Sequence, residues 1–428
     1  MKIFKFGGAS VNSASAVKNM AHIVQQHLGD EPLAVVVSAM GKSTNMLERL
    51  VPGVADENER QLLRQEIETY HRRTTEALMP TNGDTQTKIS RLLAQLDTLA
   101  TQLNPDPTHY NYNYDQVVAR GELLSTTIIA DYLNHLGINT LWVDARHLLR
   151  TDNHHREGRI DWNATSQFCH QQLEDALTRK KAQVILTQGF IASADDGSTS
   201  TLGREGSDYS ASILAYCLNA ESVTIWKDVP GFLNADPKFF KDTVKISKIP
   251  YNEAIELAYY GASVIHPKTV KPIQNKNIPL YIRSFLTPDS EGSAIGDYMS
   301  VDPETPLYIF KNNQILLSIT PKDFSFIAEE NLQTLFGYLN TLGIKVNMMQ
   351  NSALSFSICI DHNPMLVGML TQQLKASFHV RYNEHLQLIT IRYYTQEVID
   401  RIVAGRPILL EQRSRTTEQL IVPESATE

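Results

Sequence analysis

Cysteine, long apolar runs and basic charge are all scarce in this sequence. The three cysteines among 428 residues are scattered, which predicts reduced thiols and a cytoplasmic location and gives no metal-ligand spacing. The longest notable apolar run, LAVVV at residues 33–37, is far short of the roughly 20 residues that span a bilayer. A formal net charge of −8 argues against a general nucleic-acid binder. We therefore expect no membrane and no nucleic-acid partner, and any anionic ligand must be met by a few local cations.

The chain is long enough for more than one domain, since 428 residues exceed what a single hydrophobic core normally supports. Strand and helix periods alternate from the start: MKIFKF is typical of a strand, residues 14–28 of an amphipathic helix, and LAVVVSAM of a buried strand. Later strand patterns INTLWVD, QVILTQGF and ESVTIWKDV again alternate with helices. This order predicts an α/β domain over residues 1–290, with a mostly parallel sheet sandwiched by helices.

The order of predicted strands and helices changes after the Gly-, Pro- and Ser-rich stretch SFLTPDSEGSAIGD, so we expect residues 291–428 to form a separate region. A β–α–β–β–α–β order there predicts a ferredoxin-like α+β unit at about residues 315–385. A second, shortened and discontinuous unit would combine residues 304–314 with 386–428. Free strand edges in such units favour pairing with another copy, so we expect a homodimer or larger assembly.

The stretch KFGGAS places Lys5, Gly7 and Gly8 where the first strand meets the next helix. Backbone amides and a helix N-terminus at such a junction favour an anion, glycines let the main chain approach it, and a lysine supplies the countercharge. Taken alone, this motif is explained better by an ordinary turn with a surface lysine, so it needs support from other motifs.

A second candidate is LGREGSDYS, in which Gly206 opens a helix that carries Ser207 and Asp208 in its first turn. The stretch offers helix amides, a carboxylate for a lysine or metal, and the guanidinium of Arg204, which suits a carboxylate ligand. Capping would account for Ser207 or Asp208, but it does not explain Arg204.

Weaker signals come from WKDVPGFLNADPK, which leaves a buried strand at a carboxyl end, and from VVARGELLS, which carries Glu122. Taken alone, the first is compatible with a hairpin-like excursion and the second with an acid that satisfies a helix dipole. We interpret His154 and His155 as part of a solvated loop rather than a zinc site, and we predict no metal ligands in the protein.

Together and in this order, KFGGAS, VVVSAMGKSTNML, VVARGELLS, LGREGSDYS, WKDVPGFLNADPK and GASVIHPKTV resemble aspartate kinases of the amino acid kinase superfamily. The resemblance covers the first 290 residues, and the tail is similar to paired ACT regulatory domains. It implies an amino acid kinase fold followed by two ferredoxin-like ACT units, the second shortened. The implied activity moves the γ-phosphoryl of ATP to the β-carboxylate of L-aspartate, the first step of lysine, threonine and methionine biosynthesis.

The resemblance also implies roles for single residues. Lys5 would neutralise the phosphoryl group, with Asp208 steering it. Arg204 would hold the α-carboxylate of aspartate and Glu122 its ammonium group. Hydrogen bonds to substrate carboxylates would come from Ser38, Thr44 and Ser207, and nucleotide contacts from Lys5, Gly7, Gly8, Lys227, Asp228, Leu233, Lys238 and Ser263. Mg²⁺ would be held mainly by the nucleotide phosphates.

Four positions depart from the family pattern. The family often has lysine at Ser263, tyrosine at Leu233 and arginine at Lys238, and Lys238 keeps the charge without the planar fork of arginine. Glu205 replaces a glycine, which adds a negative charge close to the phosphates; it either points away or assists Mg²⁺. Nucleotide affinity and nucleoside preference stay open for this reason.

In similar proteins ACT domains bind an end-product amino acid, so lysine or threonine is the expected effector, near residues 323–326 and 348–351. A purely structural, dimer-forming role of the tail is the alternative. For the whole chain, two other functions remain open: a related kinase with another carboxylate acceptor, and a non-catalytic amino-acid sensor. The presence of both Lys5 and Asp208 argues against the sensor.

Overall fold

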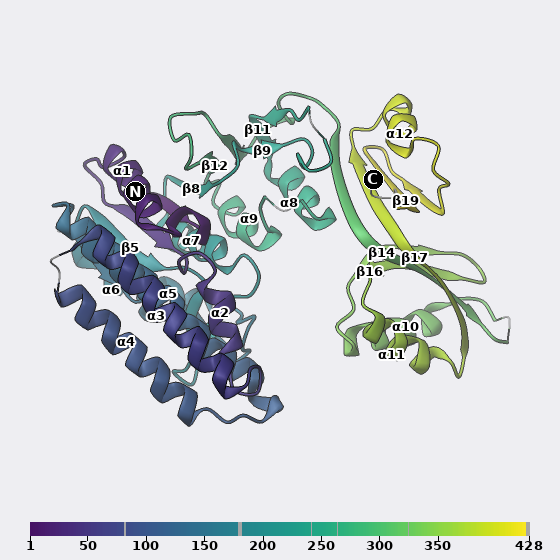
Figure 1. Ribbon diagram of the computed structural model, residues 1–428. Coiled ribbons are helices and arrows are strands. Elements are labelled where there is room, and N and C mark those ends of the chain that lie inside the picture. The colour runs from purple at the N-terminus through teal and green to yellow at the C-terminus, as the bar shows by residue number, and fades with distance from the viewer. Residues whose placement is uncertain (81–82, 179–181, 241, 263, 324, 425–428) are drawn as a thin grey trace. The chain divides into compact units, whose positions relative to one another are not determined.

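The computed structural model describes residues 1–80, 83–178, 182–240, 242–262, 264–323 and 325–424 (Figure 1). These residues divide into two compact units. The first comprises residues 1–232, 245–256 and 264–303, and the second comprises the described residues within 233–244, 257–263 and 304–428.

An eight-stranded sheet forms the centre of the first unit, with strand order β11-β13-β12-β8-β1-β2-β5-β3. Neighbouring strands are parallel except for the antiparallel pair β12–β13, which confirms the predicted mostly parallel sheet. The last strand, β13, lies beyond residue 290, so the first unit continues past the expected boundary. The strands are β1 (Lys2–Phe6), β2 (Leu33–Val37), β3 (Thr140–Val143), β5 (Val184–Gln188), β8 (Ser222–Lys227), β11 (Lys248–Pro250), β12 (Leu280–Ser284) and β13 (Ser293–Gly296).

Smaller strands complete this part of the chain. A three-stranded sheet of order β4-β6-β7 joins β4 (Arg150–Thr151), β6 (Ile191–Ala194) and β7 (Thr199–Thr201). The short strands β9 (Phe232–Leu233) and β10 (Lys245–Ile246) pair with each other. This three-stranded sheet was not predicted from the sequence, because its strands are only two to four residues long.

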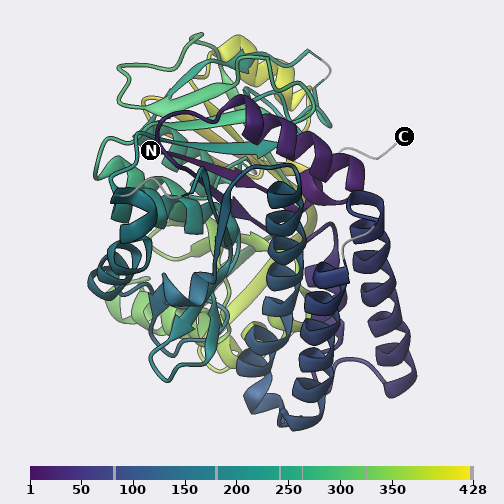
Figure 2. The ribbon, with the colours of Figure 1, turned by 90° about the vertical axis from the view of Figure 1, so that its left-hand side faces the viewer.

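Helices account for most of the chain between β2 and β3, as predicted. The long helices α3, α4 and α5 run beside one another (Figure 2). None of the helices in the described part of the chain combines the length and apolar character needed to cross a bilayer. The helices are α1 (Ala14–Gln26), α2 (Ser43–Arg49), α3 (Glu57–Leu78), α4 (Gly83–Gln102), α5 (Tyr110–His135), α6 (Trp162–Thr178), α7 (Gly206–Leu218), α8 (Tyr251–Tyr260) and α9 (Pro267–Gln274), with short 3-10 turns η1 (Gly8–Val11), η2 (Pro107–His109) and η3 (Ala145–His147).

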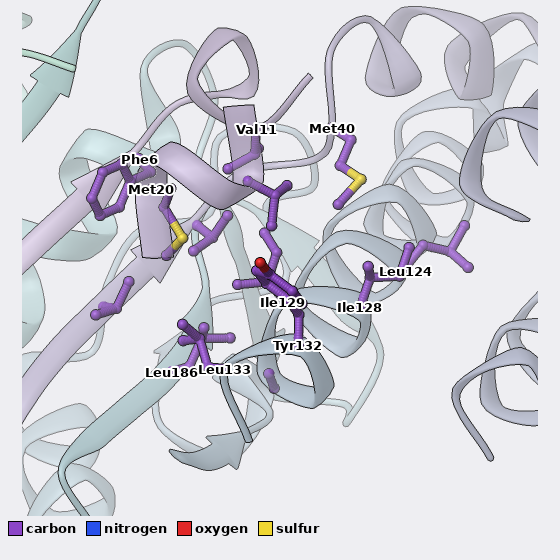
Figure 3. Packing of buried hydrophobic residues seen from close by; sticks show 14 of the residues in the cluster. Phe6, Val11, Met20, Met40, Leu124, Ile128, Ile129, Tyr132, Leu133 and Leu186 are labelled. Carbon is purple, nitrogen blue, oxygen red and sulfur yellow. The ribbon is translucent and has the colours of Figure 1, made fainter. Parts of the chain in front are cut away.

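One large apolar core joins β1, α1, β2, β5 and α5 (Figure 3). Phe6 of β1 and Met20 of α1 are almost fully buried in it, together with Ile128 and Ile129 of α5. Burial of such side chains contributes about 1.5–3 kcal/mol each. Because the same core fixes β1 and α5, it also fixes the positions from which Lys5 and Glu122 project.

The tail is built on one antiparallel six-stranded sheet of order β15-β16-β14-β17-β19-β18. It contains the predicted β–α–β–β–α–β order, followed by a shorter round with the brief helix α12. The long strands β14 and β17 pair over their whole length, with register shifts between Lys311 and Leu316, so both ferredoxin-like rounds share them. The elements are β14 (Leu307–Pro321), α10 (Glu329–Thr341), β15 (Val346–Asn351), β16 (Phe356–Asp361), α11 (Pro364–Leu374), β17 (Phe378–Arg392), α12 (Gln396–Val403), β18 (Leu410–Arg413) and β19 (Thr417–Pro423).

Candidate active site

A polar cavity of about 770 Å³ lies in the first unit, beyond the carboxyl ends of the central parallel strands. Open α/β sheets place their ligands at this edge. The cavity brings together predicted residues from four of the sequence motifs. Those that line it are Lys5, Gly8, Ser38, Thr44, Glu122, Arg204 and Ser207.

Lys5 and Asp208 form the central ion pair of the site. β1 lies between β2 and β8 in parallel register, so Lys5 is near the end of the middle strand. Asp208 stands in the first turn of α7, and its Oδ1 atom is 2.6 Å from Nζ of Lys5. Both side chains are almost inaccessible to solvent. The ammonium group therefore faces the cavity with its position set by a buried carboxylate.

Burial alone would raise the pKa of Asp208, because it removes water from the charged form. The positive charges of Lys5 and Lys227 outweigh this effect and hold the pKa of Asp208 below its usual value. Lys227 contributes directly, since its Nζ atom is 3.3 Å from Oδ2 of Asp208. Asp208 thus stays ionised and unable to donate a proton at neutral pH.

Glycine is required where the loop after β1 crosses the loop after β2. A Cβ atom on Gly8 would lie 2.9 Å from the carbonyl oxygens of Ala39 and Gly41. The amide of Gly41 in turn donates to the carbonyl of Gly8 over 3.0 Å. At Gly7, a Cβ atom would lie 3.3 Å from Nζ of Lys5, so the absence of a side chain keeps space beside the ammonium group. This cradle suits an anionic group such as a phosphate.

Glu122 of α5 supplies a second carboxylate to the cavity. Its side chain is only 2% exposed, and Oε2 has no hydrogen-bond partner among the described residues. Burial raises the pKa of Glu122 to about 8, although a hydrogen bond from the backbone of Ala39 and the charge of Lys5 act in the opposite direction. A buried carboxyl oxygen without a partner is suited to a cationic ligand group.

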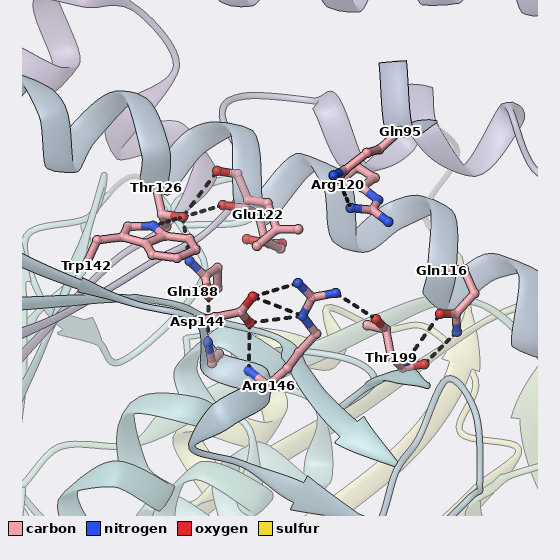
Figure 4. A network of polar contacts seen from close by, with 12 residues as sticks. Gln95, Gln116, Arg120, Glu122, Thr126, Trp142, Asp144, Arg146, Gln188 and Thr199 are labelled. Atoms are coloured by element: carbon pink, nitrogen blue, oxygen red, sulfur yellow. Dashed lines mark hydrogen bonds and ion pairs between the residues drawn. The ribbon is translucent and has the colours of Figure 1, made fainter. Parts of the chain in front are cut away.

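Polar contacts behind Glu122 hold its helical turn (Figure 4). The hydroxyl of Thr126 donates to the carbonyl of Glu122 over 2.9 Å and accepts from the side chains of Trp142 and Gln188. Six residues before Glu122 on the same helix, the side-chain amide of Gln116 pairs with the backbone of Thr199 in β7. These bonds fix α5 against β7, the strand that leads to Arg204.

Asp115 is a buried carboxylate that the sequence reasoning missed. It accepts three hydrogen bonds: from the Thr201 hydroxyl at 2.6 Å, from Nδ1 of His155 at 2.9 Å and from the amide of Arg156 at 3.0 Å. Burial raises the pKa of Asp115, and these donors offset part of the effect. Because Thr201 precedes Arg204 by only three residues, Asp115 ties the segment of His155 to the segment of Arg204.

The interpretation as a solvated loop holds for His154, which is exposed outside any helix or strand, but it was wrong for His155. Residues 154–157 line the cavity, and the side chain of His155 is mostly buried. The guanidinium of Arg156 lies over the ring of Tyr114, 4.4 Å from its centroid, and the backbone of Arg156 is left-handed with φ 70°. A run of His, His and Arg gives no pattern-based signal of this arrangement, which depends on a distant buried acid.

Comparison with known proteins decides the family. The model of the "Amino acid kinase family" matches residues 1–284. The chain is 31% identical over 403 residues to lysine-sensitive aspartokinase 3 of Escherichia coli, covering 91% of this chain and 86% of that protein. The chain belongs to the amino acid kinase family. It also spans 42% of the length of the bifunctional aspartokinase/homoserine dehydrogenase 1 of Zea mays, at 29% identity over 392 residues.

Solved structures agree along almost the whole length of this amino acid kinase. E. coli aspartokinase III in complex with aspartate and ADP, in its R-state, has a TM-score of 0.85 at 28% identity and covers 99% of this chain and 96% of that one. The same enzyme in complex with lysine and aspartate, in its T-state, has a TM-score of 0.81 with the same coverage. The fold class predicted from the sequence is confirmed, with an amino acid kinase fold followed by ACT-type α+β units.

Several of the residues expected to contact the nucleotide are not among those that line the cavity. In this amino acid kinase Lys227 contacts Asp208, whereas Asp228 is exposed in the turn after β8. Leu233 and Lys238 belong to the second unit, so their contacts to a nucleotide remain predictions, and Ser263 lies outside the described residues. In the described ranges no cluster of three or more His, Cys, Asp or Glu side chains has a geometry that would hold a metal ion.

Proposed function

We propose that this chain is an aspartate kinase, which transfers the γ-phosphoryl of ATP to the β-carboxylate of L-aspartate and forms 4-phospho-L-aspartate. The observation that carries the proposal is the Lys5–Asp208 pair beside a cavity that also contains Arg204 and the partnerless carboxyl oxygen of Glu122. The similarity to aspartokinases over nearly the whole chain supports it.

The reaction needs charge compensation rather than a general base. A β-carboxylate has a pKa of about 3.9, so its nucleophilic oxygen is already ionised at neutral pH. That oxygen forms a bond to the γ-phosphorus, the bond from this phosphorus to the bridging oxygen breaks, and ADP leaves with the electron pair. The obstacle is repulsion between a dicarboxylate and a triphosphate, which positioning and cationic side chains overcome.

The two sides of the cavity match an amino acid zwitterion. Arg204 offers a planar fork for the α-carboxylate, and Glu122 offers a buried acceptor for the α-ammonium. Ser38, Thr44 and Ser207 line the same cavity and carry hydroxyl donors for the carboxylates. Selection for both charged groups distinguishes aspartate from simple dicarboxylic acids.

The nucleotide phosphates would lie against Lys5 and the amides of Gly7 and Gly8, where a side chain on Gly7 would take up the space beside the ammonium. Mg²⁺ would reach the site bound to these phosphates and neutralise part of their charge, as is usual for this ion. Lys227, Asp228, Leu233, Lys238 and Ser263 remain the proposed further contacts of the nucleotide.

We place catalysis in the first unit and regulation in the tail that begins near residue 304. Lysine is the favoured effector, because the curated relative is lysine-sensitive and a lysine complex of E. coli aspartokinase III has the same overall fold. The proposed contacts are residues 323–326, of which 324 lies outside the described part, and residues 348–351. Exposed apolar side chains at Phe326, Phe336 and Met349 favour pairing of tails in a homodimer.

A cytoplasmic location remains part of the proposal, supported by three free, buried cysteines.

The proposed regulation is tested by measuring activity with lysine or threonine at millimolar concentration, together with the molar mass by light scattering. Inhibition by lysine in a dimeric protein is expected. A monomer whose activity is unchanged by either amino acid would favour a tail without an effector role.

The acceptor is tested by trapping the acyl phosphate with hydroxylamine while a coupled assay follows ADP release. The assay is run with aspartate, glutamate and acetylglutamate. We expect hydroxamate and ADP in equal amounts with aspartate alone. Product from another acceptor would identify a related kinase, and no product from any acceptor would favour the non-catalytic sensor.

A further inference from the structure

Four alternating charges run along one side of the site. Lys5 contacts Oδ1 of Asp208 at 2.6 Å, and Lys227 contacts Oδ2 of the same carboxylate at 3.3 Å. Lys227 in turn lies 3.9 Å from Oε2 of Glu205. One buried carboxylate is therefore shared by two ammonium groups, one on each oxygen.

Strand register explains why the two lysines meet. β8 is parallel to β1, with Ile225 opposite Lys5. Lys227 is two residues beyond Ile225, and side chains alternate between the faces of a sheet with period two. Lys227 therefore projects from the same face as Lys5, toward the first turn of α7.

The single negative charge of Asp208 does not neutralise both Lys5 and Lys227. Two ammonium groups and one carboxylate leave a net positive charge, and Lys227 has a further ion-pair partner in Glu205, while the charge of Asp228 also raises its pKa. Glu205 is a weak partner, because 36% of its side chain is exposed and 3.9 Å exceeds a hydrogen-bond distance. Lys227 is 19% exposed and stays charged, since Asp208 and Glu205 raise its pKa against the lowering effect of burial.

The backbone of Glu205 supports a functional reason for its side chain. Glu205 precedes the first residue of α7 with φ 53°, in the left-handed region. A residue with a Cβ atom is less favourable than glycine in this conformation, because its Cβ approaches the following carbonyl oxygen. Glu205 nevertheless lines the cavity and directs its carboxylate to Lys227, so the opposite expectation, that it points away, is wrong.

We infer that Lys227 is a second phosphate-facing cation of the transfer reaction and that Glu205 is its displaceable counter-ion. The inference rests on the proposed kinase function. When the triphosphate enters, its oxygens replace the Glu205 carboxylate at Lys227, and Asp208 holds both ammonium groups against the migrating phosphoryl. Lys227 thereby gains a catalytic role that differs from the contact to the rest of the nucleotide implied by the resemblance.

The test compares Lys227→Met, Lys227→Arg, Glu205→Gln and Glu205→Gly with wild type. We expect Lys227→Met to lower kcat by about 10²–10³-fold, as for other removed transition-state donors, with a smaller change in the aspartate KM. Lys227→Arg should recover part of the rate. Both Glu205 variants should lower the ATP KM by about two- to fivefold, since they remove a competing partly exposed ion pair. Glu205→Gly alone should also raise Tm.

The surface pair Lys2–Glu221 provides a matched control. It has the same 3.9 Å separation as Lys227–Glu205, but its side chains are 49% and 65% exposed and lie on the opposite end of β1 from Lys5. Lys2→Met and Glu221→Gln should leave kcat and the ATP KM unchanged. Should Lys227→Met fail to fold, the two Glu205 variants carry the test alone, and an unchanged ATP KM in both would overturn the proposal.

Two other outcomes also overturn it. If Lys227→Met keeps the wild-type kcat, Lys227 does not act on the migrating phosphoryl group. A higher ATP KM with this unchanged kcat would mean that Lys227 binds ATP equally well in the ground state and in the transition state. Wild-type protein that forms no aspartyl hydroxamate contradicts the proposed function itself. If the wild type forms aspartyl hydroxamate and Lys227→Met has the same kcat, only the role of Lys227 is contradicted.

Discussion

Nζ of Lys5 lies 2.6 Å from Oδ1 of Asp208, although one residue stands in the first strand and the other in the seventh helix. The pair exists because β1 is the middle strand of three parallel neighbours and α7 begins at the edge where those strands end. A buried, ionised carboxylate thus fixes a cation beside the cavity of the proposed active site. Electrostatic preorganisation of this kind stabilises charge in a transition state without rearrangement during the reaction.

Replacing Lys5 by methionine should reduce kcat by about 10²–10³-fold, because the ammonium group acts on charge that develops in the transition state. The aspartate KM should change far less. Steady-state kinetics at saturating ATP measure both values. Lys18→Met, on the exposed face of α1, is the matched control and should behave as wild type. A change confined to KM would contradict the assigned role of Lys5.

Glu122→Gln should have opposite effects on two properties: it should stabilise the fold at pH 8 and weaken the binding of aspartate. The carboxyl of Glu122 has a pKa of about 8 in the folded chain against 4.5 as its ordinary value, so the folded state binds the extra proton between these limits. The free energy of unfolding must then fall as pH rises through this window, by up to about 1.4 kcal/mol per unit. Glu122→Gln should flatten this slope and be more stable at pH 8, as measured by urea unfolding without substrate.

The same carboxyl should make aspartate binding depend on pH. An ammonium ligand favours the ionised form, so binding below pH 8 requires loss of a proton. The aspartate KM should fall by up to about tenfold for each unit from pH 6.5 to 8 and level off above it. In Glu122→Gln the KM should be high and independent of pH. A flat profile in the wild type would show that Glu122 does not take the ammonium group.

Gly8→Ala should damage the cradle through the backbone. The added Cβ atom meets two carbonyl oxygens at 2.9 Å, neither of which belongs to a flexible side chain. We expect a loss of about 1–3 kcal/mol in stability, as in other overpacked sites, and at least a tenfold loss in kcat. Gly29→Ala, where no atom lies within 4 Å of the new Cβ, should change stability by less than about 0.5 kcal/mol. If Gly8→Ala and Gly29→Ala have the same Tm and the same kcat, the proposed steric conflict at Gly8 is contradicted.

Asp115→Ala should raise the aspartate KM by about tenfold with a smaller effect on kcat, because the loss of three accepted hydrogen bonds releases the segments of His155 and Arg204. Asp115→Asn retains an acceptor oxygen and should lie between Asp115→Ala and wild type. Asp97→Asn removes a partly exposed ion pair with Arg64 and serves as the control. If Asp115→Ala lowers Tm while the KM stays at the wild-type value, Asp115 is structural only.

Much of the fold was predictable, because buried parallel strands and amphipathic helices leave clear patterns. Lys5, Gly8, Arg204 and Ser207 were predictable from their motifs, because these stand at a strand end or at the start of a helix. The roles of Ser38, Thr44 and Glu122 came only from the resemblance to the family. The strand β13 was missed because SAIG is short and flanked by turn-forming residues. Asp115 was missed because its partners come from distant segments, and burial is what makes its carboxylate important. The left-handed Glu205 became interpretable only when Lys227 was placed beside it.

The most direct measurement is the yield of aspartyl hydroxamate from wild type and Lys5→Met under saturating ATP and aspartate, with the position of the hydroxamate determined by mass spectrometry. We predict β-aspartyl hydroxamate from wild type in proportion to ADP, and a rate reduced by at least about 100-fold in a folded Lys5→Met. A folded Lys5→Met that forms the product at the wild-type rate would contradict the account.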